Sequence, residues 1–426
     1  MCFVEVKIRS YSYKNFERYK MKIKHISFLA LFIIIFNTSD AQWVQGDVFS
    51  VGIVYSLEAS GNYIFAGVSN RGVYRSQNNG HTWVQTSLNN VTVLSLYANG
   101  SLILAGSRYN GLYRSTDYGT TWNITSLKWK DVHAIVFIDD TLYAGVDHTG
   151  GLFKSTNSGQ NWIQLGNLGS DIKAIVKKDN IIIAGTDGSG IYYTTNYGEN
   201  WQQTSLQGKN ISSVLKSGDN YFAGTYIFEN PAGVWHSTNT GLNWNLTSQN
   251  TKPVNSIISY NENIFIGASH NSSITGGFLV SSDNGLSWTE KNQGFSSIPS
   301  IYSLLITNNY IFAGTNGQSV WKRPLSQVID VKNISSEIPT DFSLEQNYPN
   351  PFNSITNVKF QIINSGIVKI KVYDLLGKEV KTIVNEYMQP GTYNVSFDAE
   401  GLSSGVYFYR MEASNFTSTK KCVLLK

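Results

Sequence analysis

Short apolar runs separated by turn residues recur along most of the chain. One unit contains the runs Val93–Gly100, Leu102–Gly106 and Gly111–Ser115, followed by a segment that opens with Trp122. The runs are rich in β-branched and aromatic residues, are bounded by Gly and Asn, and lack helical periodicity, so they predict strands joined by tight turns. We therefore expect an all-β protein built largely from four-stranded units.

The third and fourth predicted strands of each unit are joined by nearly the same eight residues. STDYGTTW recurs as SQNNGHTW, STNSGQNW, TTNYGENW, STNTGLNW and SSDNGLSW, and the closing tryptophans stand at positions 83, 122, 162, 201, 244 and 288. This spacing of about 40 residues is typical of the four-stranded blades of a β-propeller.

The recurring residues have the chemistry of a turn. An Asx side chain can accept a hydrogen bond from the backbone N–H two residues on, a glycine supplies a positive φ, and a tryptophan buries a large apolar area in the outer part of the blade. The residues assigned to these turns are Asn78, Gly80, Trp83, Asp117, Gly119, Trp122, Asn157, Gly159, Trp162, Asn196, Gly198, Trp201, Asn239, Gly241, Trp244, Asp283, Gly285 and Trp288.

This stretch resembles the Asp box, or BNR repeat, of sialidases, sortilin-type receptors and other secreted propellers. The resemblance implies a structural turn at each copy, and a ligand or metal site at each copy is the alternative. We favour the turn, and we expect no cofactor and no metal site.

The number of blades follows from the two ends of the repeat region. After Trp288, residues 300–326 supply three more predicted strands and no eight-residue turn, whereas Gln42–Gln45 matches Thr82–Gln85, the start of a fourth strand. A sheet that lacks its outer strand has an open edge. We therefore predict a seven-bladed β-propeller over residues 42–325, closed by its N-terminal strand.

The N-terminal 41 residues carry most of the charge imbalance. Residues 21–41 have the basic start, short apolar run and small-residue exit of a signal peptide, and residues 1–20 are a probable upstream extension. Without residues 1–41, 26 basic and 26 acidic residues remain of the 33 and 29 in the whole chain. This balance argues against a nucleic-acid partner, and the mature chain has no predicted transmembrane segment.

No catalytic constellation is visible in the repeats. The arginine triad that sialidases use is absent, and xyloglucanase-like enzymes use two propellers where this chain predicts one. A secreted glycoside hydrolase that uses two of the scattered acids remains the alternative function. We assign no catalytic residue and favour a non-catalytic propeller that binds extracellular glycan or protein.

A binding surface is expected on the loops that join second to third strands and on the loops that link successive blades. Exposed aromatic and polar groups together suit sugar stacking or protein contact. The candidates for this binding face are Arg71, Arg108, Tyr109, Trp129, Asp147, His148, Asp187, Tyr226 and His270.

The repeats give way to a polar linker, predicted at residues 326–341, and then to strands with alternating apolar residues that predict an Ig-like β-sandwich over residues 342–426. The pieces Tyr348–Asn353, Val372–Asp374 with Gly377-Lys378, Gly391–Tyr393 and Ser404–Tyr409 resemble the type A C-terminal sorting domain of the type IX secretion system. The resemblance implies that residues 342–426 engage the type IX machinery, and that the protein is secreted from, or attached to the outer-membrane surface of, a Gram-negative bacterium.

Overall fold

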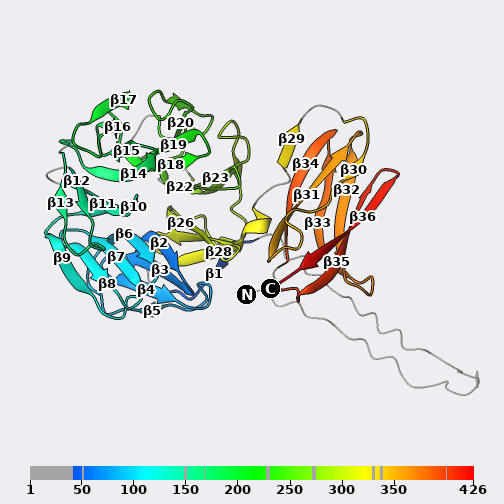
Figure 1. The fold of residues 1–426 in the computed structure, drawn as a ribbon, viewed down its shortest axis with the longest axis horizontal. Coiled ribbons are helices and arrows are strands. Elements are labelled where there is room, and N and C mark those ends of the chain that lie inside the picture. Colours follow the sequence, from blue (N-terminus) through cyan, green and yellow to red (C-terminus); the bar gives the residue numbers. More distant parts are fainter. Residues whose placement is uncertain are drawn as a thin grey trace, which may run out of the picture. The chain divides into compact units, whose positions relative to one another are not determined.

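The computed structural model describes residues 42–49, 52–147, 151–166, 168–226, 231–270, 275–328, 332–335, 339–399 and 401–426. These residues form 36 strands and a single short 3-10 helix, η1 (Leu325–Gln327), so the prediction of an all-β protein is confirmed (Figure 1). In the described part of the chain, no helix has both the length and the apolar character needed to span a membrane. The predicted signal peptide and the upstream extension lie outside the described residues.

Twenty-eight of the strands form seven antiparallel four-stranded sheets. The first four sheets are β2 (Val54–Ser60), β3 (Tyr63–Val68), β4 (Gly72–Ser76), β5 (Val84–Gln85); β6 (Val93–Asn99), β7 (Leu102–Ser107), β8 (Gly111–Ser115), β9 (Asn123–Lys128); β10 (Val132–Ile138), β11 (Thr141–Val146), β12 (Gly151–Ser155), β13 (Ile163–Gln164); and β14 (Ile172–Lys178), β15 (Ile181–Thr186), β16 (Gly190–Thr194), β17 (Gln202–Gln207). The next three are β18 (Ile211–Ser217), β19 (Asn220–Thr225), β20 (Val234–Ser237), β21 (Asn245–Leu246); β22 (Val254–Tyr260), β23 (Asn263–Ala268), β24 (Gly277–Ser281), β25 (Thr289–Glu290); and β26 (Ile301–Thr307), β27 (Tyr310–Thr315), β28 (Val320–Pro324) with β1 (Val44–Gln45).

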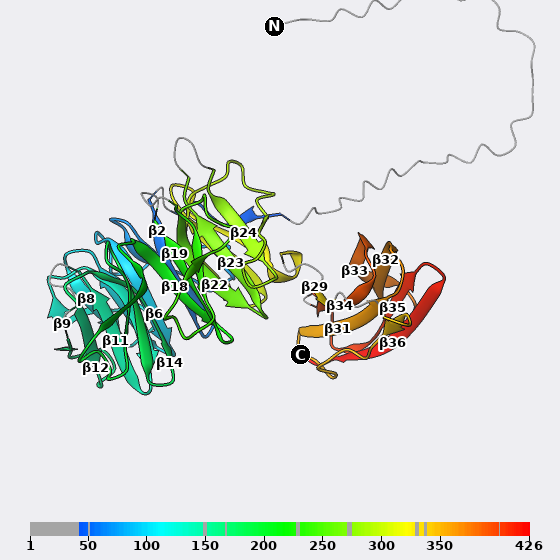
Figure 2. The ribbon, with the colours of Figure 1, turned by 90° about the horizontal axis from the view of Figure 1, so that it is seen from above.

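The seventh sheet combines both ends of the repeat region. β1 pairs antiparallel with β28, with Val44 opposite Lys322, so the N-terminal strand supplies the outer strand that the last unit lacks, as predicted. This sheet also lies beside the first one, because the Ser303 hydroxyl donates a hydrogen bond to the Val54 backbone oxygen. The seven inner strands surround a common centre in Figure 1; they are β2, β6, β10, β14, β18, β22 and β26. Figure 2 shows the same sheets from above.

The core lies between neighbouring sheets, which explains the glycine near the end of each second strand. A Cβ built on Gly67 would come within 2.6 Å of Val93 Cγ1, on the inner strand of the next sheet. The same contact closes the ring, since a Cβ on Gly314 would lie 2.7 Å from Val54 Cγ1. Because real Cβ atoms do not approach so closely, the absence of a side chain at these positions lets adjacent sheets pack against each other.

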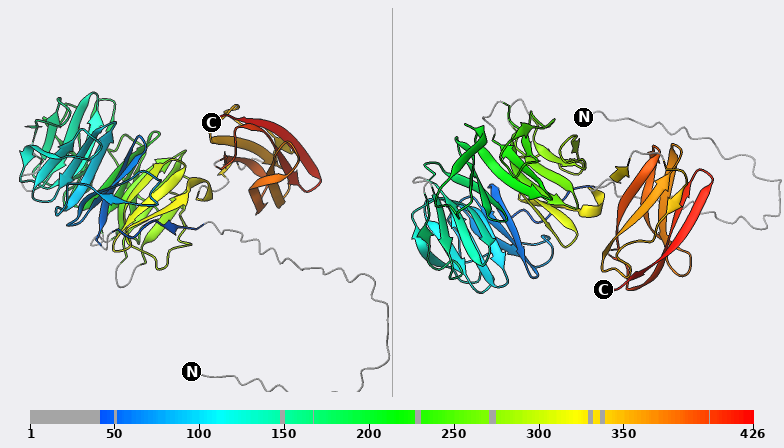
Figure 3. Two further views of the ribbon diagram at one scale, coloured as in Figure 1. Left: turned by 90° about the horizontal axis from the view of Figure 1, so that it is seen from below. Right: turned by 45° about the horizontal axis from the view of Figure 1, so that its top comes forward.

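The remaining eight strands form a separate pair of sheets around a core of their own, which agrees with the predicted β-sandwich. One sheet has the order β29 (Lys332–Ser335), β34 (Gly391–Asp398), β31 (Ile355–Ile362), β30 (Ser343–Leu344), and the other has the order β33 (Glu379–Met388), β32 (Gly366–Tyr373), β35 (Gly405–Ala413), β36 (Phe416–Leu424). Both are visible in the two views of Figure 3. β29 falls within residues 326–341, expected to be a linker, and pairs with β34.

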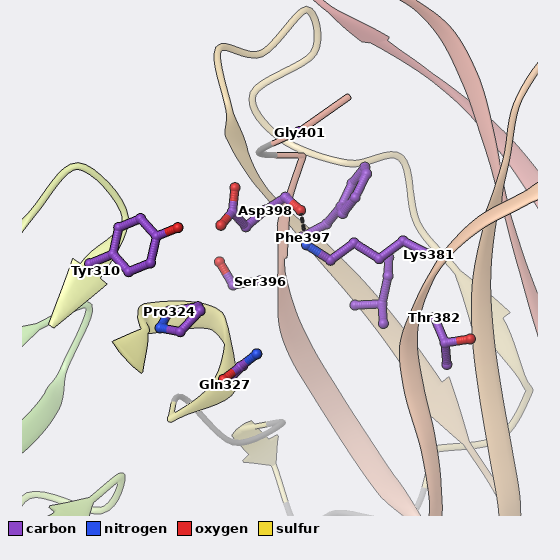
Figure 4. A pocket seen from close by; sticks show the side chains of 10 residues that line it. Tyr310, Pro324, Gln327, Lys381, Thr382, Ser396, Phe397, Asp398 and Gly401 are labelled. Atoms are coloured by element: carbon purple, nitrogen blue, oxygen red, sulfur yellow. Dashed lines mark hydrogen bonds between the residues drawn. The ribbon is translucent and has the colours of Figure 1, made fainter. Parts of the chain in front are cut away.

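A side-chain hydrogen bond joins the two sheets of this β-sandwich. The Lys381 ammonium of β33 donates a hydrogen bond to the backbone oxygen of Asp398 at the end of β34 (Figure 4), which links a strand of one sheet to a strand of the other. Cys422 lies in the shared core, where burial raises the pKa of its thiol to about 11. A thiol in that environment is unreactive at neutral pH.

Candidate functional site

Every inner strand of the propeller begins with the same irregularity. In the first sheet the pairing of β2 with β3 shifts register between Val54 and Ser56, and the same shift occurs at the start of the other six inner strands. The second residue of each strand is thus the extra residue of a β-bulge, a feature that redirects a side chain. These bulge residues are Tyr55, Leu94, His133, Lys173, Ser212, Asn255 and Tyr302.

The seven bulge residues line one cavity of about 370 Å³, together with Arg108, Asp187 and Tyr226. Each of these three residues directly follows a second strand, β7, β15 or β19. A further cavity of about 270 Å³ is lined by residues of all seven inner strands. The larger cavity is therefore the mouth of the central channel, and we call it the channel mouth.

A charged cluster occupies one side of the channel mouth. Lys173 Nζ lies 3.0 Å from His133 Nε2, 3.4 Å from Asp187 Oδ2 and 3.9 Å from Asp147 Oδ2. His133 Nε2 in turn lies 3.3 Å from Asp147 Oδ2. The Lys173 and Asp147 side chains are each only 9% exposed, whereas Asp187 is 40% exposed. Asp187 is therefore the carboxylate that an incoming ligand meets first.

The side chains of Asp131, His133 and Asp147 offer three ligand atoms within 4.8 Å of one another, a spacing that suits a metal ion. All three groups already have partners in the protein, since Asp147 contacts His133 and Lys173. The Lys173 ammonium lies at His133 Nε2, and Asp131 Oδ1 accepts the Tyr109 backbone N–H at 2.5 Å. Because an ammonium group and a loop amide already use these atoms, we assign no metal to the cluster.

The other side of the channel mouth is aromatic. The Tyr55 and Tyr302 rings meet edge to face with centroids 5.6 Å apart, and the Arg108 guanidinium lies 5.8 Å from the Tyr55 ring centroid. Burial, followed by the charge of Asp187, raises the pKa of Tyr226 to about 12. Its phenol therefore stays protonated at neutral pH and can donate a hydrogen bond to a ligand, but it is poorly suited to act as a nucleophile.

The structure places the residues of the predicted binding face in three groups. Arg108, Asp187 and Tyr226 line the channel mouth, and Asp147 contacts it through His133 and Lys173. Tyr109 and Trp129 are exposed on loops that touch each other through the Trp129 N–H and the Asn110 oxygen, 3.3 Å apart. Arg71 and His270 lie on loops at the same end of the sheets without lining the channel mouth, and His270 pairs with Ser300. His148 lies outside the described residues.

The sequence analysis did not identify the seven bulge residues. The repeats contain a usable signal, because the inner strands open as VYSL, VLSL, VHAI, IKAI, ISSV, VNSI and IYSL. The first, third and fourth positions hold one kind of residue throughout, while the second changes from sheet to sheet. A variable position in an otherwise constant strand is free of the packing that fixes its neighbours.

The six eight-residue turns lie at the opposite ends of the strands from the channel mouth, and all have the same bonds. In the turn that begins at Ser155, the Ser155 hydroxyl donates to Asn157 Oδ1 at 2.9 Å and accepts the Gly159 N–H at 3.1 Å. Asn157 Oδ1 also accepts the Asn161 N–H, four residues on, at 2.9 Å. We predicted a partner two residues on; that N–H is instead bound by the serine, whose role the sequence analysis missed.

The glycine and tryptophan of each turn connect it to the rest of the fold. In five of the six turns the indole N–H donates to the oxygen of the turn glycine at 2.7–3.2 Å, and Trp201 lacks this bond. Each glycine has a positive φ between 70° and 93° and lies against the preceding sheet. A Cβ on Gly241, for example, would lie 2.5 Å from Ile183 Cδ1. The turns therefore pack sheet against sheet.

The comparisons with known families identify the C-terminal region. Residues 346–425 match the family described as the secretion system C-terminal sorting domain. This domain marks proteins that Gram-negative bacteria export through the type IX system, either to the cell surface or into the medium. The expected localisation is therefore confirmed, and no curated protein matches the chain.

The solved structures that resemble the chain show its fold. YCF48 from Cyanidioschyzon merolae is 13% identical with a TM-score of 0.53, over 66% of this chain and 98% of the other. The computationally designed Ika8 protein is 11% identical with a TM-score of 0.50, over 67% of this chain and 99% of the other. At such identities these likenesses support the propeller fold and carry nothing about function.

Proposed function

We propose that the protein is a secreted or surface-attached, non-catalytic β-propeller that binds an extracellular glycan or protein at the channel mouth. The ring of seven bulge residues carries this proposal. Their side chains differ from sheet to sheet while the surrounding strand positions stay constant, and they meet around a cavity of about 370 Å³. A concave site with a few polar groups converging beside aromatic faces is typical of a ligand-binding site.

We also propose that the six recurring turns are Asp boxes with a structural role. In each turn the first hydroxyl donates a hydrogen bond to the Asx oxygen and accepts one from the glycine N–H. These bonds use the polar groups that a ligand or metal would otherwise contact. A stabilising turn in each sheet explains why the same eight residues recur.

A glycoside hydrolase remains the second candidate because two carboxylates lie near the channel mouth. Asp147 and Asp187 both approach Lys173 Nζ, at 3.9 and 3.4 Å, so these two carboxylate oxygens lie within about 7 Å of each other, and glycosidases use separations of about 5–10 Å. The Lys173 ammonium, however, is within ion-pair distance of both carboxylates, which would otherwise act on the scissile bond. This geometry favours binding without cleavage.

One experiment separates the two functions. The purified full chain is incubated with a panel of polysaccharides, and both retention and product masses are recorded. Binding without cleavage predicts retained, intact glycan, and retention is lost in Arg108→Gln. Shortened products that disappear in Asp147→Asn or Asp187→Asn would overturn the proposal in favour of a hydrolase. A solved structure of YCF48 carries the D1 peptide, so a peptide library is the second panel.

The role of the C-terminal region is tested separately. Removing residues 342–426 is expected to leave the propeller in the periplasm, since this region contains the match to the sorting domain. Cell fractionation and surface labelling of the truncated and full-length proteins measure this directly. Surface display of the truncated protein would contradict the proposal that residues 342–426 direct export.

A further inference from the structure

A second cavity lies beside the channel mouth, and its lining indicates which class of ligand the protein binds. This cavity, of about 440 Å³, shares Tyr55 and Arg108 with the channel mouth and extends to Tyr109 and Asn110. Its other lining residues come from loops of the first and second sheets: Ile53, Ser69, Asn70, Asn90, Val91 and Thr92. The two cavities thus adjoin at the Arg108–Tyr55 contact, and we call the second one the side groove.

Two aromatic residues are presented to solvent where the side groove ends. The Tyr109 and Trp129 side chains are 65% and 79% exposed, and their backbones have positive φ values of 65° and 58°. A non-glycine residue in this conformation costs about 1 kcal/mol. Large aromatic residues normally avoid both the exposure and the strain.

The surrounding bonds hold these two loops in place. Asp131 Oδ1 accepts the Tyr109 N–H at 2.5 Å, and the Asn110 oxygen accepts the Trp129 N–H at 3.3 Å. Asp131 is itself buried, so its carboxylate is a fixed anchor for the Tyr109 loop. The structure therefore keeps both rings outward at some cost, which is the arrangement expected of residues that stack on a ligand.

The lining of the side groove indicates the chemistry of that ligand. Amide and hydroxyl side chains dominate it, Ile53 and Val91 are its aliphatic residues, and Arg108 is its charged residue. Many peptide-binding grooves have apolar pockets for side chains, and the side groove has two aliphatic residues. Aromatic faces beside neutral hydrogen-bonding groups suit the alternating C–H faces and hydroxyl groups of a sugar chain.

We infer that the ligand is a linear, neutral glycan whose end enters the channel mouth and whose next units follow the side groove, stacking on Tyr109 and then on Trp129. This inference rests on the proposed binding function and adds the ligand class, the direction of the chain and two stacking residues. We assign the chain end to the channel mouth because residues of all seven inner strands surround it, and the following units to the side groove because this cavity adjoins the channel mouth at Tyr55 and Arg108 and includes Tyr109.

The test uses the full chain and linear gluco-, xylo- and manno-oligosaccharides from one to six units, with calorimetry and tryptophan emission as readouts. In at least one series, affinity is expected to rise by roughly three- to tenfold per stacked ring as the chain reaches Tyr109 and Trp129, then to level off. The emission should shift to the blue on binding, because Trp129 is the most exposed tryptophan described. This shift should disappear in Trp129→Phe, and cyclic oligosaccharides should not compete.

Matched variants isolate the stacking. Tyr109→Asn removes the ring, and asparagine tolerates the left-handed backbone, so this variant should fold and lose the gain in affinity with length. Tyr197→Asn is its control, since Tyr197 is also exposed with a positive φ, of 56°, but lies in an eight-residue turn away from the channel mouth. It should bind like the unaltered protein.

The outcomes separate this inference from the proposed function. Affinity that is independent of chain length and unaffected by Tyr109→Asn, but lost in Arg108→Gln, would overturn the side-groove inference and leave the channel mouth as the binding site. Binding of peptides alone would overturn the glycan assignment and support a protein partner. If no oligosaccharide and no peptide binds, both proposals fail.

Discussion

The two ends of the propeller sheets differ in how strictly their residues repeat from one sheet to the next. At one end, six turns repeat nearly the same residues with the same bonds, as in Ser155 to Asn157 and Gly159. At the other end, the bulge of each inner strand places a different kind of side chain in the channel mouth, apart from the tyrosine that occurs twice. Both ends belong to the same sheets. The comparison teaches that the repeat is constant where it packs sheet against sheet and variable where its side chains line the channel mouth.

The largest expected effect is at a turn glycine. Gly241→Ala should lower the free energy of unfolding by about 2–4 kcal/mol, because its Cβ would lie 2.5 Å from Ile183 Cδ1 and its φ is 76°. Gly218→Ala is the control, with a φ of 57° and no atom within 4 Å of the added Cβ, and should cost about 1 kcal/mol. Urea unfolding measures both; equal losses would show that the contact between sheets is unimportant.

Removing the hydroxyl that begins a turn should cause the second-largest loss of stability. Ser155→Ala leaves the Gly159 N–H without its acceptor in a buried position, which should cost about 1–2 kcal/mol. The matched variant Ser87→Ala removes an exposed hydroxyl that bonds only to the Thr120 oxygen and should change stability by less than about 0.5 kcal/mol. Thermal melts of the two variants distinguish them, and a Ser155→Ala protein as stable as Ser87→Ala would contradict the role of the hydroxyl.

The carboxyl group of Glu58 on β2 should make the stability of the protein depend on pH. Burial raises its pKa from 4.5 to about 7 in the folded protein, so folding favours the protonated form, and this contribution to stability is present below pH 4.5 and lost as the pH rises to about 7. Glu58→Gln should therefore stabilise the protein above pH 7, by on the order of 1–2 kcal/mol, and have little effect at pH 4. Melting temperatures across this range test the sign; a stabilisation independent of pH would exclude titration of Glu58.

The smallest effect is expected at the Asx position of a turn. Asp117→Asn should change stability at pH 7 by only a few tenths of a kcal/mol, because four of the six turns already have asparagine there. Hydrogen bonding, first from the Thr121 N–H, lowers the pKa of Asp117 to about 2. The stability that this carboxylate adds should therefore be lost as the pH falls from about 4 to 2, while the asparagine variant should be insensitive over that range. A parallel acid titration of both proteins checks this difference.

The repeating features of the fold could be predicted from the sequence, because a blade of fixed length with one recurring turn leaves a strong pattern. The seventh sheet was also predictable, since Gln42–Gln45 repeats Thr82–Gln85. The channel mouth was only partly predictable. Arg108, Asp187 and Tyr226 stand at the ends of second strands, where loops were expected to bind, whereas Lys173 and Tyr302 lie inside strands and reach the channel mouth only because of the bulges. Pairing register is not visible in one strand alone.

The central claim is that the turns at one end of the sheets stabilise the fold and the channel mouth at the other end binds the ligand. It is tested most directly by measuring both stability and ligand retention in the variants Arg108→Gln and Ser155→Ala. The account predicts that Arg108→Gln abolishes retention of the glycan or peptide that the unaltered chain binds and leaves the melting temperature nearly unchanged. Ser155→Ala should lower the melting temperature and, at temperatures where it is folded, bind normally. Full retention by Arg108→Gln, or loss of binding in folded Ser155→Ala, would contradict it.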